Sequence, residues 1–398
     1  MSVIWQESTF CQPRVHSLWP VLVNILLPDT ILQAEDTASV SNSLKKHKKG
    51  RKSSSSEEEI AKNVQCFCEV VIEGSLLLSS HDRKHLALDI LLLLLPRLPS
   101  SFIPIVLSYK LVQCLIDILS TKDSWLYKVA QCLLKELLDW VRNDDVRRAA
   151  VIVAFQKHSN GKFDCISKTK TVKNLMAEFK TETGCMLFVQ NLINLFLDEG
   201  HASEEPSDQS QTTDENSEIG SIEDKDSIGI VGNADFLKGW VIESLPSVLK
   251  HLKLDPEAKF RVQKEILKFL AVQGLFSASL GNEVTSFELQ EKFRWPKATT
   301  SSALCRMCIE QLQSLLANAQ KVEEPRSLAN GLEPNDLGCY FMRFFSTLRN
   351  IPSVSLFRTL NDEDEQAVKR LQEMESTLYK EVSLISSFTN NNQCFSLG

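Results

Sequence analysis

Hydrophobic residues recur at helical spacing through most of the chain. Between residues 85 and 158 the apolar positions fall three or four residues apart, with no alternating strand pattern among them. Short polar or proline-containing breaks divide this stretch into segments of ordinary helix length, at residues 96–101, 120–124, 143–144 and 159–161. Each of these helices is too apolar to stand alone in water, so the pattern predicts helices that stack against one another.

This pattern predicts an all-α fold, an ARM/HEAT-like helical-repeat solenoid with long disordered inserts. Asp82 is a candidate cap for a helix over residues 85–95. Asp255 followed by Pro256 is a strong start signal for a later helix, because Asp caps a helix and Pro fits its first turn. The predicted segments are a first helix of the array (1–32), a disordered basic, serine-rich and acidic insert (33–59), a helical-repeat segment (60–200), a disordered acidic linker (201–234), a second helical-repeat segment (235–349), and a C-terminal amphipathic helix with a frayed tail (350–398).

The net charge, the cysteines and the length of the apolar runs limit the classes of protein to which the chain can belong. The 398 residues carry a formal net charge of -7, which argues against a uniformly basic nucleic-acid coat but allows a local basic face. The 11 cysteines are scattered through apolar patterns, as expected in a reducing compartment rather than in a secreted disulfide framework. The apolar run at residues 91–95 is too short to cross a bilayer, and Met1 is not followed by a secretory signal pattern.

A basic run lies in the first predicted insert. A mobile run of this kind can bind an acidic import receptor, so nuclear import is the first interpretation and a solvated charged linker is the alternative. The import candidates are Lys45, Lys46, Lys48, Lys49, Arg51 and Lys52. Serines beside glutamates are candidate phosphorylation sites that would offset this charge, namely Ser53, Ser54, Ser55, Ser56 and, in the acidic linker, Ser203.

A second group of basic residues gathers around the turn at residues 160–161. If these residues share a face, they can contact a nucleic-acid backbone in a salt-dependent and sequence-independent way. A merely solvated face is the equally weighted alternative. The candidate contacts are Arg147, Arg148, Lys157, Lys162, Lys168, Lys170 and Lys173.

Three residue pairs have spacings found in catalytic or metal sites. Cys305 and Cys308 have redox-motif spacing, but they fall inside a helical pattern and no second pair completes a zinc site. His81 and His85 lie four residues apart, without the glutamate of a metallohydrolase motif. Asp144 and Asp145 are the obvious carboxylate pair for two-metal chemistry, but they precede a helix and are better interpreted as acidic residues at its start, with Asn143 or Asp144 as the cap. The prediction is therefore no catalytic residue, no metal site and no cofactor.

Several stretches carry a resemblance to a known family. They are PRVHSLWPVLVNILLPD near the start, DSWLYKVAQ and NDDVRRAAVIVAFQKHSNGKFD in the middle, and SLPSVLKHLKLDPEAKFRVQKEILKFLAVQGLF further on. These stretches and the order of elements around them resemble the DNA polymerase V family, also called the DNA polymerase phi or Myb-binding protein 1A-like family, and are most similar to plant members. Proteins of that family are longer at both ends, so the chain is expected to be a shortened or partial one.

The resemblance implies a non-enzymatic nuclear and nucleolar scaffold in ribosomal RNA gene transcription, ribosome biogenesis and transcriptional regulation, with direct DNA binding. Its partners would be nuclear and nucleolar proteins, with ribosomal DNA or RNA bound through the basic patches. No membrane or small-molecule substrate is expected. Two alternatives stay open: a template-directed DNA polymerase, as the family name states, and a cytoplasmic helical-repeat adaptor. No catalytic residue can be carried over from the family, because the sequence has no nucleotide-binding glycine-rich loop.

Overall fold

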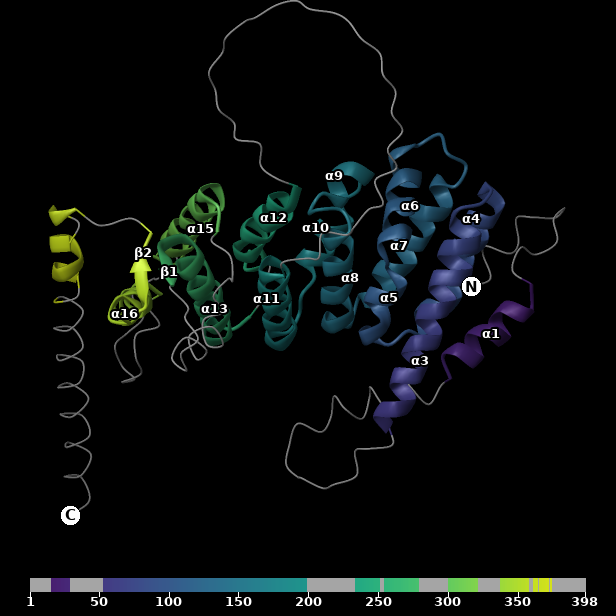
Figure 1. Cartoon of the computed structure of the whole chain (residues 1–398), viewed down its shortest axis with the longest axis horizontal. Helices are drawn as coiled ribbons and strands as arrows, with labels where there is room; N and C mark the ends of the chain where they lie inside the picture. The colour runs from purple at the N-terminus through teal and green to yellow at the C-terminus, as the bar shows by residue number, and fades with distance from the viewer. Residues whose placement is uncertain are drawn as a thin grey trace, which may run out of the picture.

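The described part of the chain folds almost entirely into helices, as the hydrophobic pattern predicts. The computed structural model describes residues 16–28, 53–198, 233–250, 254–278, 300–320, 337–357, 361–363, 365–371 and 373. Its helices stand side by side in one elongated row, with α1 at one end and α16 at the other (Figure 1). The prediction of an all-α protein is confirmed apart from one pair of short strands.

The larger part of the row comes from the first two hundred residues. Its elements are α1 (Leu18–Leu26), α3 (Ser53–Phe67), the π-helix η1 (Cys68–Leu77), α4 (His81–Leu94), the 3₁₀ turns η2 (Leu95–Arg97) and η3 (Ser100–Phe102), α5 (Ile103–Val106), α6 (Tyr109–Ser120), α7 (Tyr127–Val141), α8 (Asp145–Lys157), α9 (Phe163–Ser167), α10 (Thr171–Ala177) and α11 (Glu182–Leu197). The second part adds α12 (Asn233–Val248), α13 (Pro256–Leu275), strand β1 (Phe276–Ala278), α15 (Ser302–Gln320), α16 (Leu337–Arg349) and strand β2 (Val354–Leu356).

Side-chain caps fix several helix starts. The Asp255 carboxylate accepts the Ala258 N–H at 2.9 Å, and Pro256 occupies the first position of α13, as predicted from the sequence. The Thr181 hydroxyl accepts the Gly184 N–H at 3.0 Å at the start of α11. Each cap satisfies a backbone N–H that has no partner within its own helix, so these residues define where the helices begin.

Two helix starts differ from the prediction. Helix α3 begins at Ser53, so residues 53–59, which were predicted to belong to the disordered insert, are helical. The far end of α3 is held in the core by Val64 and Phe67, and extending an anchored helix adds one hydrogen bond per residue without a new nucleation step. Helix α4 begins at His81, so Asp82 lies in its first turn and does not cap it.

The antiparallel pair of β1 and β2 was not predicted. Phe276 lies opposite Leu356 and Ala278 opposite Val354, and the Phe357 N–H extends the ladder to the Leu275 carbonyl at 3.0 Å. Phe276 is 1% exposed, and its ring lies 5.3 Å from that of Phe345 on α16. Three-residue strands are too short to show an alternating pattern, so the sequence does not predict them. They form because the segments that follow α13 and α16 lie next to each other.

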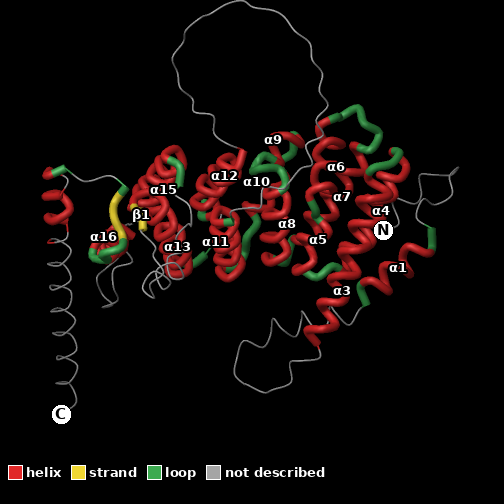
Figure 2. The backbone as a smooth tube through the Cα atoms, in the orientation of Figure 1, coloured by secondary structure: helices red, strands yellow, loops and turns green. Residues whose placement is uncertain are grey.

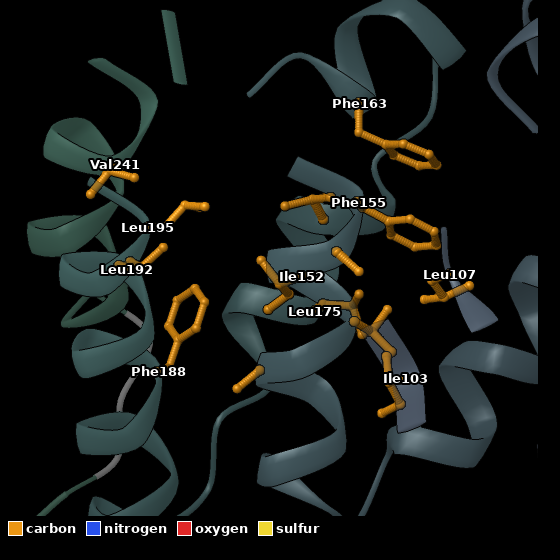
Figure 3. Close-up of a cluster of buried hydrophobic side chains, with 14 of the residues drawn as sticks. Ile103, Leu107, Ile152, Phe155, Phe163, Leu175, Phe188, Leu192, Leu195 and Val241 are labelled. Atoms are coloured by element: carbon orange, nitrogen blue, oxygen red, sulfur yellow. The ribbon is translucent and has the colours of Figure 1, made fainter. Parts of the chain in front are cut away.

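A continuous core runs along the row and joins each helix to its neighbours. In Figure 3, Ile152 of α8 lies on the side of Phe188 and Leu192 of α11, with Val241 of α12 beyond them, whereas Phe155 of α8 lies on the other side, beside Phe163. Helix α11 thus contacts α8 on one side and α12 and α13 on the other. The loops that connect the helices lie mainly at the edges of the row (Figure 2).

The apolar run at residues 91–95 lies in α4 and η2, where Leu91, Leu94 and Leu95 are buried. Among the described residues no single helix is long and apolar enough to cross a membrane. One bent pair of helices, Ser100–Val106 with Tyr109–Ser120, passes the same test of length and composition, and core helices of soluble proteins pass it as well.

The turn after α8 holds the first part of the row against α12. Asn160 and Gly161 both have positive φ, at 50° and 77°, and a Cβ on Gly161 would lie 2.7 Å from the Trp240 Cβ. The next residue, Lys162, places its ammonium 3.4 Å from the centre of the Phe236 ring. Glycine is required at position 161 for both its backbone conformation and its close approach to α12.

We expect Gly161→Ala to destabilise the fold by about 1–3 kcal/mol, because alanine is strained in this conformation and its methyl group meets Trp240. Gly239→Ala is the matched control. Its Cβ would lie 3.4 Å from the Met307 Cε, in ordinary contact, so alanine in this helix interior should stabilise α12 by about 0.5–1 kcal/mol. Urea unfolding followed by circular dichroism measures both, and equal effects of the two substitutions would contradict this account.

Candidate nucleic-acid interface

The acidic pair at the start of α8 has a structural role. The Asp144 carboxylate accepts the Val146 N–H at 2.9 Å and the Arg147 N–H at 3.0 Å, so Asp144 caps α8 as the sequence predicted. It also lies 3.1 Å from the Arg147 Nε. One carboxylate oxygen of Asp144 thus accepts two backbone N–H groups while the other lies in an ion pair, which is the arrangement of a helix cap.

Asp145 is engaged more fully than Asp144. One oxygen pairs with the fully buried guanidinium of Arg148, and the other accepts the Thr181 N–H at 2.9 Å and the Thr181 hydroxyl at 2.7 Å. Arg148 also donates to the carbonyls of Val141 and Arg142, at 3.1 and 2.6 Å, where α7 ends. Asp145 and Arg148 therefore connect the end of α7, the start of α8 and the start of α11.

The prediction that Arg148 contacts nucleic acid is wrong, because its side chain is 0% exposed. Its neighbour Arg147 is only 20% exposed, lies over the Trp140 ring at 4.7 Å and pairs with Asp144. A buried cation needs a carboxylate and carbonyls to offset its lost hydration, and the end of α7 supplies them. Neither arginine of α8 is therefore placed to bind a nucleic-acid phosphate.

Two of the candidate lysines are also engaged within the fold. Lys157 pairs with Asp198 at 3.1 Å, and Lys162 lies over Phe236. The Lys157–Asp198 pair lies at the rim of an open pocket of about 590 Å³ between α5, α8 and α11. Burial, and then the charge of Lys157, lower the pKa of His158 in this pocket, so its imidazole is neutral at pH 7.

The other three candidate lysines form an exposed basic ridge, which consists of Lys168, Lys170 and Lys173. Lys168 ends α9 in a left-handed conformation with φ of 55°, and Lys170 and Lys173 lie at the start of α10. Asp164 holds this corner, because its carboxylate accepts the N–H groups of Val172 and Lys173, both at 3.0 Å. Within the described part of the chain, no ion pair involves the side chains of the three lysines, so all three charges face solvent.

An exposed tryptophan that was not predicted follows α6, the helix that packs against α9. Trp125 lies in the turn between α6 and α7 and is 48% exposed, and Lys122 and Lys128 on either side of it are exposed as well. A tryptophan that directly follows the polar residues Asp123 and Ser124 in a predicted break was the available signal. This position alone does not predict an exposed side chain, because tryptophan in a helical array is usually part of the core.

The other candidate pairs fit ordinary structural roles. Burial raises the pKa of the Cys308 thiol and, less strongly, that of Cys305, so both thiols of this pair in α15 stay protonated at neutral pH. His81 and His85 lie against Trp125, and the His85 Nε2 is 3.7 Å from the Asp89 carboxylate. In the described ranges, no three His, Cys, Asp or Glu side chains converge on a position suited to a metal ion.

Some candidate residues cannot be placed. Lys45, Lys46, Lys48, Lys49, Arg51 and Lys52 lie outside the described residues, as does Ser203. Ser53 to Ser56 form the first turn of α3, directly before three glutamates. Import and phosphorylation at these positions therefore stay predictions from the sequence.

Comparison with known proteins gives one result. A family model described as DNA polymerase phi matches residues 3–397, which is nearly the whole chain. No curated protein and no solved structure matched.

We expect Asp145→Ala to lower the free energy of unfolding by about 3–5 kcal/mol, because it leaves the buried charge of Arg148 without its carboxylate. Asp144→Ala is the matched control next to it and should cost only about 0.5–2 kcal/mol, the usual effect of losing a cap. Chemical unfolding of both variants provides the measurement. Similar losses in the two would show that the Asp145–Arg148 pair has no special role.

Proposed function

Because the chain belongs to the DNA polymerase phi family, we propose that it is a non-enzymatic helical scaffold of the nucleus and nucleolus. In this role it serves ribosomal RNA gene transcription, ribosome biogenesis and transcriptional regulation, holds nuclear proteins, and contacts DNA or RNA through its basic ridge. The observation that carries the proposal is the row of helices (Figure 1) together with the exposed basic ridge, whose lysines form no ion pair within the described residues.

The arrangement of the helices supports the scaffold role. Helices that pack mainly on their neighbours in a row have two long edges and two faces on which partners can bind. We propose that the row is an ARM/HEAT-like repeat solenoid, in which degenerate helix pairs build such an extended surface. A scaffold needs this kind of surface more than it needs a deep catalytic cleft.

The state of the acidic pair supports the non-enzymatic role. Two-metal nucleotidyl transfer needs carboxylate oxygens that are free to hold metal ions. The oxygens of Asp144 and Asp145 instead accept backbone N–H groups, the Thr181 hydroxyl and the guanidinium of Arg148, and Asp144 also forms an ion pair with Arg147. Both residues therefore stabilise the fold in the place where the sequence offered its most obvious candidates for polymerase chemistry.

The nuclear location is supported only by the family and by the basic run at residues 45–52, which lies outside the described residues. Imaging of a tagged chain, with and without neutralisation of this run, tests it. Cytoplasmic signal in both cases would favour the alternative of a cytoplasmic adaptor.

We expect the purified chain to show no primer extension with magnesium and all four deoxynucleotides, because its best carboxylate pair is engaged in folding. A known polymerase serves as the positive control. Incorporation that disappears in Asp144→Ala, the variant that leaves the buried Asp145–Arg148 pair in place, would contradict the proposal and support the polymerase interpretation of the family name.

We expect nucleic-acid binding to weaken steeply with salt and to show little sequence preference, because the ridge offers only charge to phosphates. Replacing Lys168, Lys170 and Lys173 with Gln should reduce the slope of log K against log salt by roughly 2–3, since each lost phosphate contact contributes about 0.7–0.9. The charge-matched control replaces three other exposed lysines with Gln, namely Lys110, Lys135 and Lys250. Equal slopes for both triple variants would remove the ridge from the proposal.

A further inference from the structure

Trp125 is held in an exposed position by its neighbours in the turn. The Ser124 N–H donates to the Thr121 carbonyl at 3.0 Å, and the Tyr127 N–H donates to the Ser124 carbonyl at 2.9 Å. The adjacent Leu126 is 1% exposed and anchors the turn in the core. The backbone is therefore fixed on both sides of Trp125, while about half of the indole side chain faces solvent. Burying that surface would stabilise the fold, so its exposure costs stability.

Two histidine rings extend the aromatic surface of Trp125. The His81 ring lies 6.1 Å from the indole at an interplanar angle of 38°, and the His85 ring lies 5.7 Å away at 67°, edge to face. The His85 Nε2 lies 3.7 Å from the carboxylate of Asp89, one helical turn further along α4. The two imidazole rings of α4 thus hold the indole of the turn in place before any ligand arrives, so a stacking partner would need little reorganisation.

The basic ridge lies on the same edge of the row. The Ser120 hydroxyl at the end of α6 donates to the Ile166 carbonyl in α9 at 3.2 Å, which joins the turn that carries Trp125 to the corner that carries the ridge. In Figure 1, α9 and the end of α6 lie along the same upper edge of the molecule. Lys122 and Lys128 flank Trp125 and carry no ion pair within the described part of the chain.

Acidic residues offset only part of this charge. Asp123 lies beside Lys122 and Asp82 beside His81, while Asp164 is occupied by the backbone of α10. The five lysines of this edge, Lys122, Lys128, Lys168, Lys170 and Lys173, therefore outnumber the exposed carboxylates of Asp82, Asp117 and Asp123 among the described residues. The edge presents cations on both sides of a fixed aromatic ring.

We propose that this edge binds single-stranded nucleic acid, with one unpaired base stacked on Trp125 and the adjoining phosphates on Lys122, Lys128 and the basic ridge. The proposal rests on the proposed function and specifies the form of nucleic acid that the ridge takes. Aromatic rings between cations bind single strands without sequence preference, because every base has a π-face. In a duplex the bases are stacked on each other, so Trp125 contributes nothing there and only the lysines act.

The test measures fluorescence anisotropy of labelled 20-nucleotide uridine RNA, thymidine DNA and a DNA duplex of the same length with the full chain. We expect Trp125→Ala to weaken binding of either single strand by roughly 5- to 100-fold, the usual loss of one stacked base, and to leave duplex binding unchanged. Trp125→Phe should retain most of the affinity. The matched control is Tyr109→Ala, which removes an aromatic side chain that is 53% exposed at the opposite end of α6.

The outcomes distinguish the stacking site at Trp125 from the basic ridge of the proposed function. Unchanged single-strand affinity in Trp125→Ala, with circular dichroism showing an intact fold, would overturn the stacking site even if binding still depends on the basic ridge. An equal loss for single strands and duplex would overturn it as well. Loss of the ridge dependence itself would overturn the nucleic-acid part of the proposed function. A difference between the RNA and DNA strands would identify which of the two is the better ligand.

Discussion

The pairing of Arg148 with Asp145 is the interaction on which the middle of the molecule depends. A guanidinium with no exposure is stable in a helical core only if its charge and its hydrogen-bond donors are satisfied. The carboxylate of Asp145 and the last carbonyls of α7 satisfy them, and the second oxygen of Asp145 then holds the start of α11. Gly184 allows this approach, because a Cβ at that position would lie 2.2 Å from the Asp145 Cβ. Three helices are therefore set relative to one another by one ion pair, and α12 and α13 pack on the last of them.

The sequence predicted much of the fold, and the reasons differ from element to element. Helix breaks and the caps at Asp144 and Asp255 were predictable, because capping is a local interaction between a side chain and the next turn of backbone. The start of α3 and the pairing of β1 with β2 were not, because both depend on packing against distant parts of the chain. The same distinction explains Arg148. Its neighbours in sequence suggested a basic face, whereas its burial follows from where α7 ends and α11 begins.

The candidate interface was predictable in composition but not in arrangement. Of the seven basic residues that the sequence grouped together, the fold uses four for internal contacts and leaves Lys168, Lys170 and Lys173 exposed. Charge in a sequence does not show which cations have partners, because the partners of Lys157 and Lys162 come from residues 41 and 74 positions further along. Trp125 belongs to the same edge only because α6 ends against α9.

The contact of the turn at residues 160–162 with α12 has a consequence for how the family can vary. Helices α11 and α12 pack directly on each other, and Gly161 and Lys162 hold α12 in place, so Asp198 and Asn233 are fixed points of the fold. In general, the entropic cost of joining two fixed points of a chain rises only with the logarithm of the number of residues between them, by about 0.6 kcal/mol for each doubling. The stretch between residues 198 and 233 can therefore gain or lose residues during evolution at little cost in stability. Changes in its length and charge need not disturb the packing of the helices. A single insertion in the turn at residues 160–162, by contrast, would displace the contacts of Gly161 and Lys162 with α12.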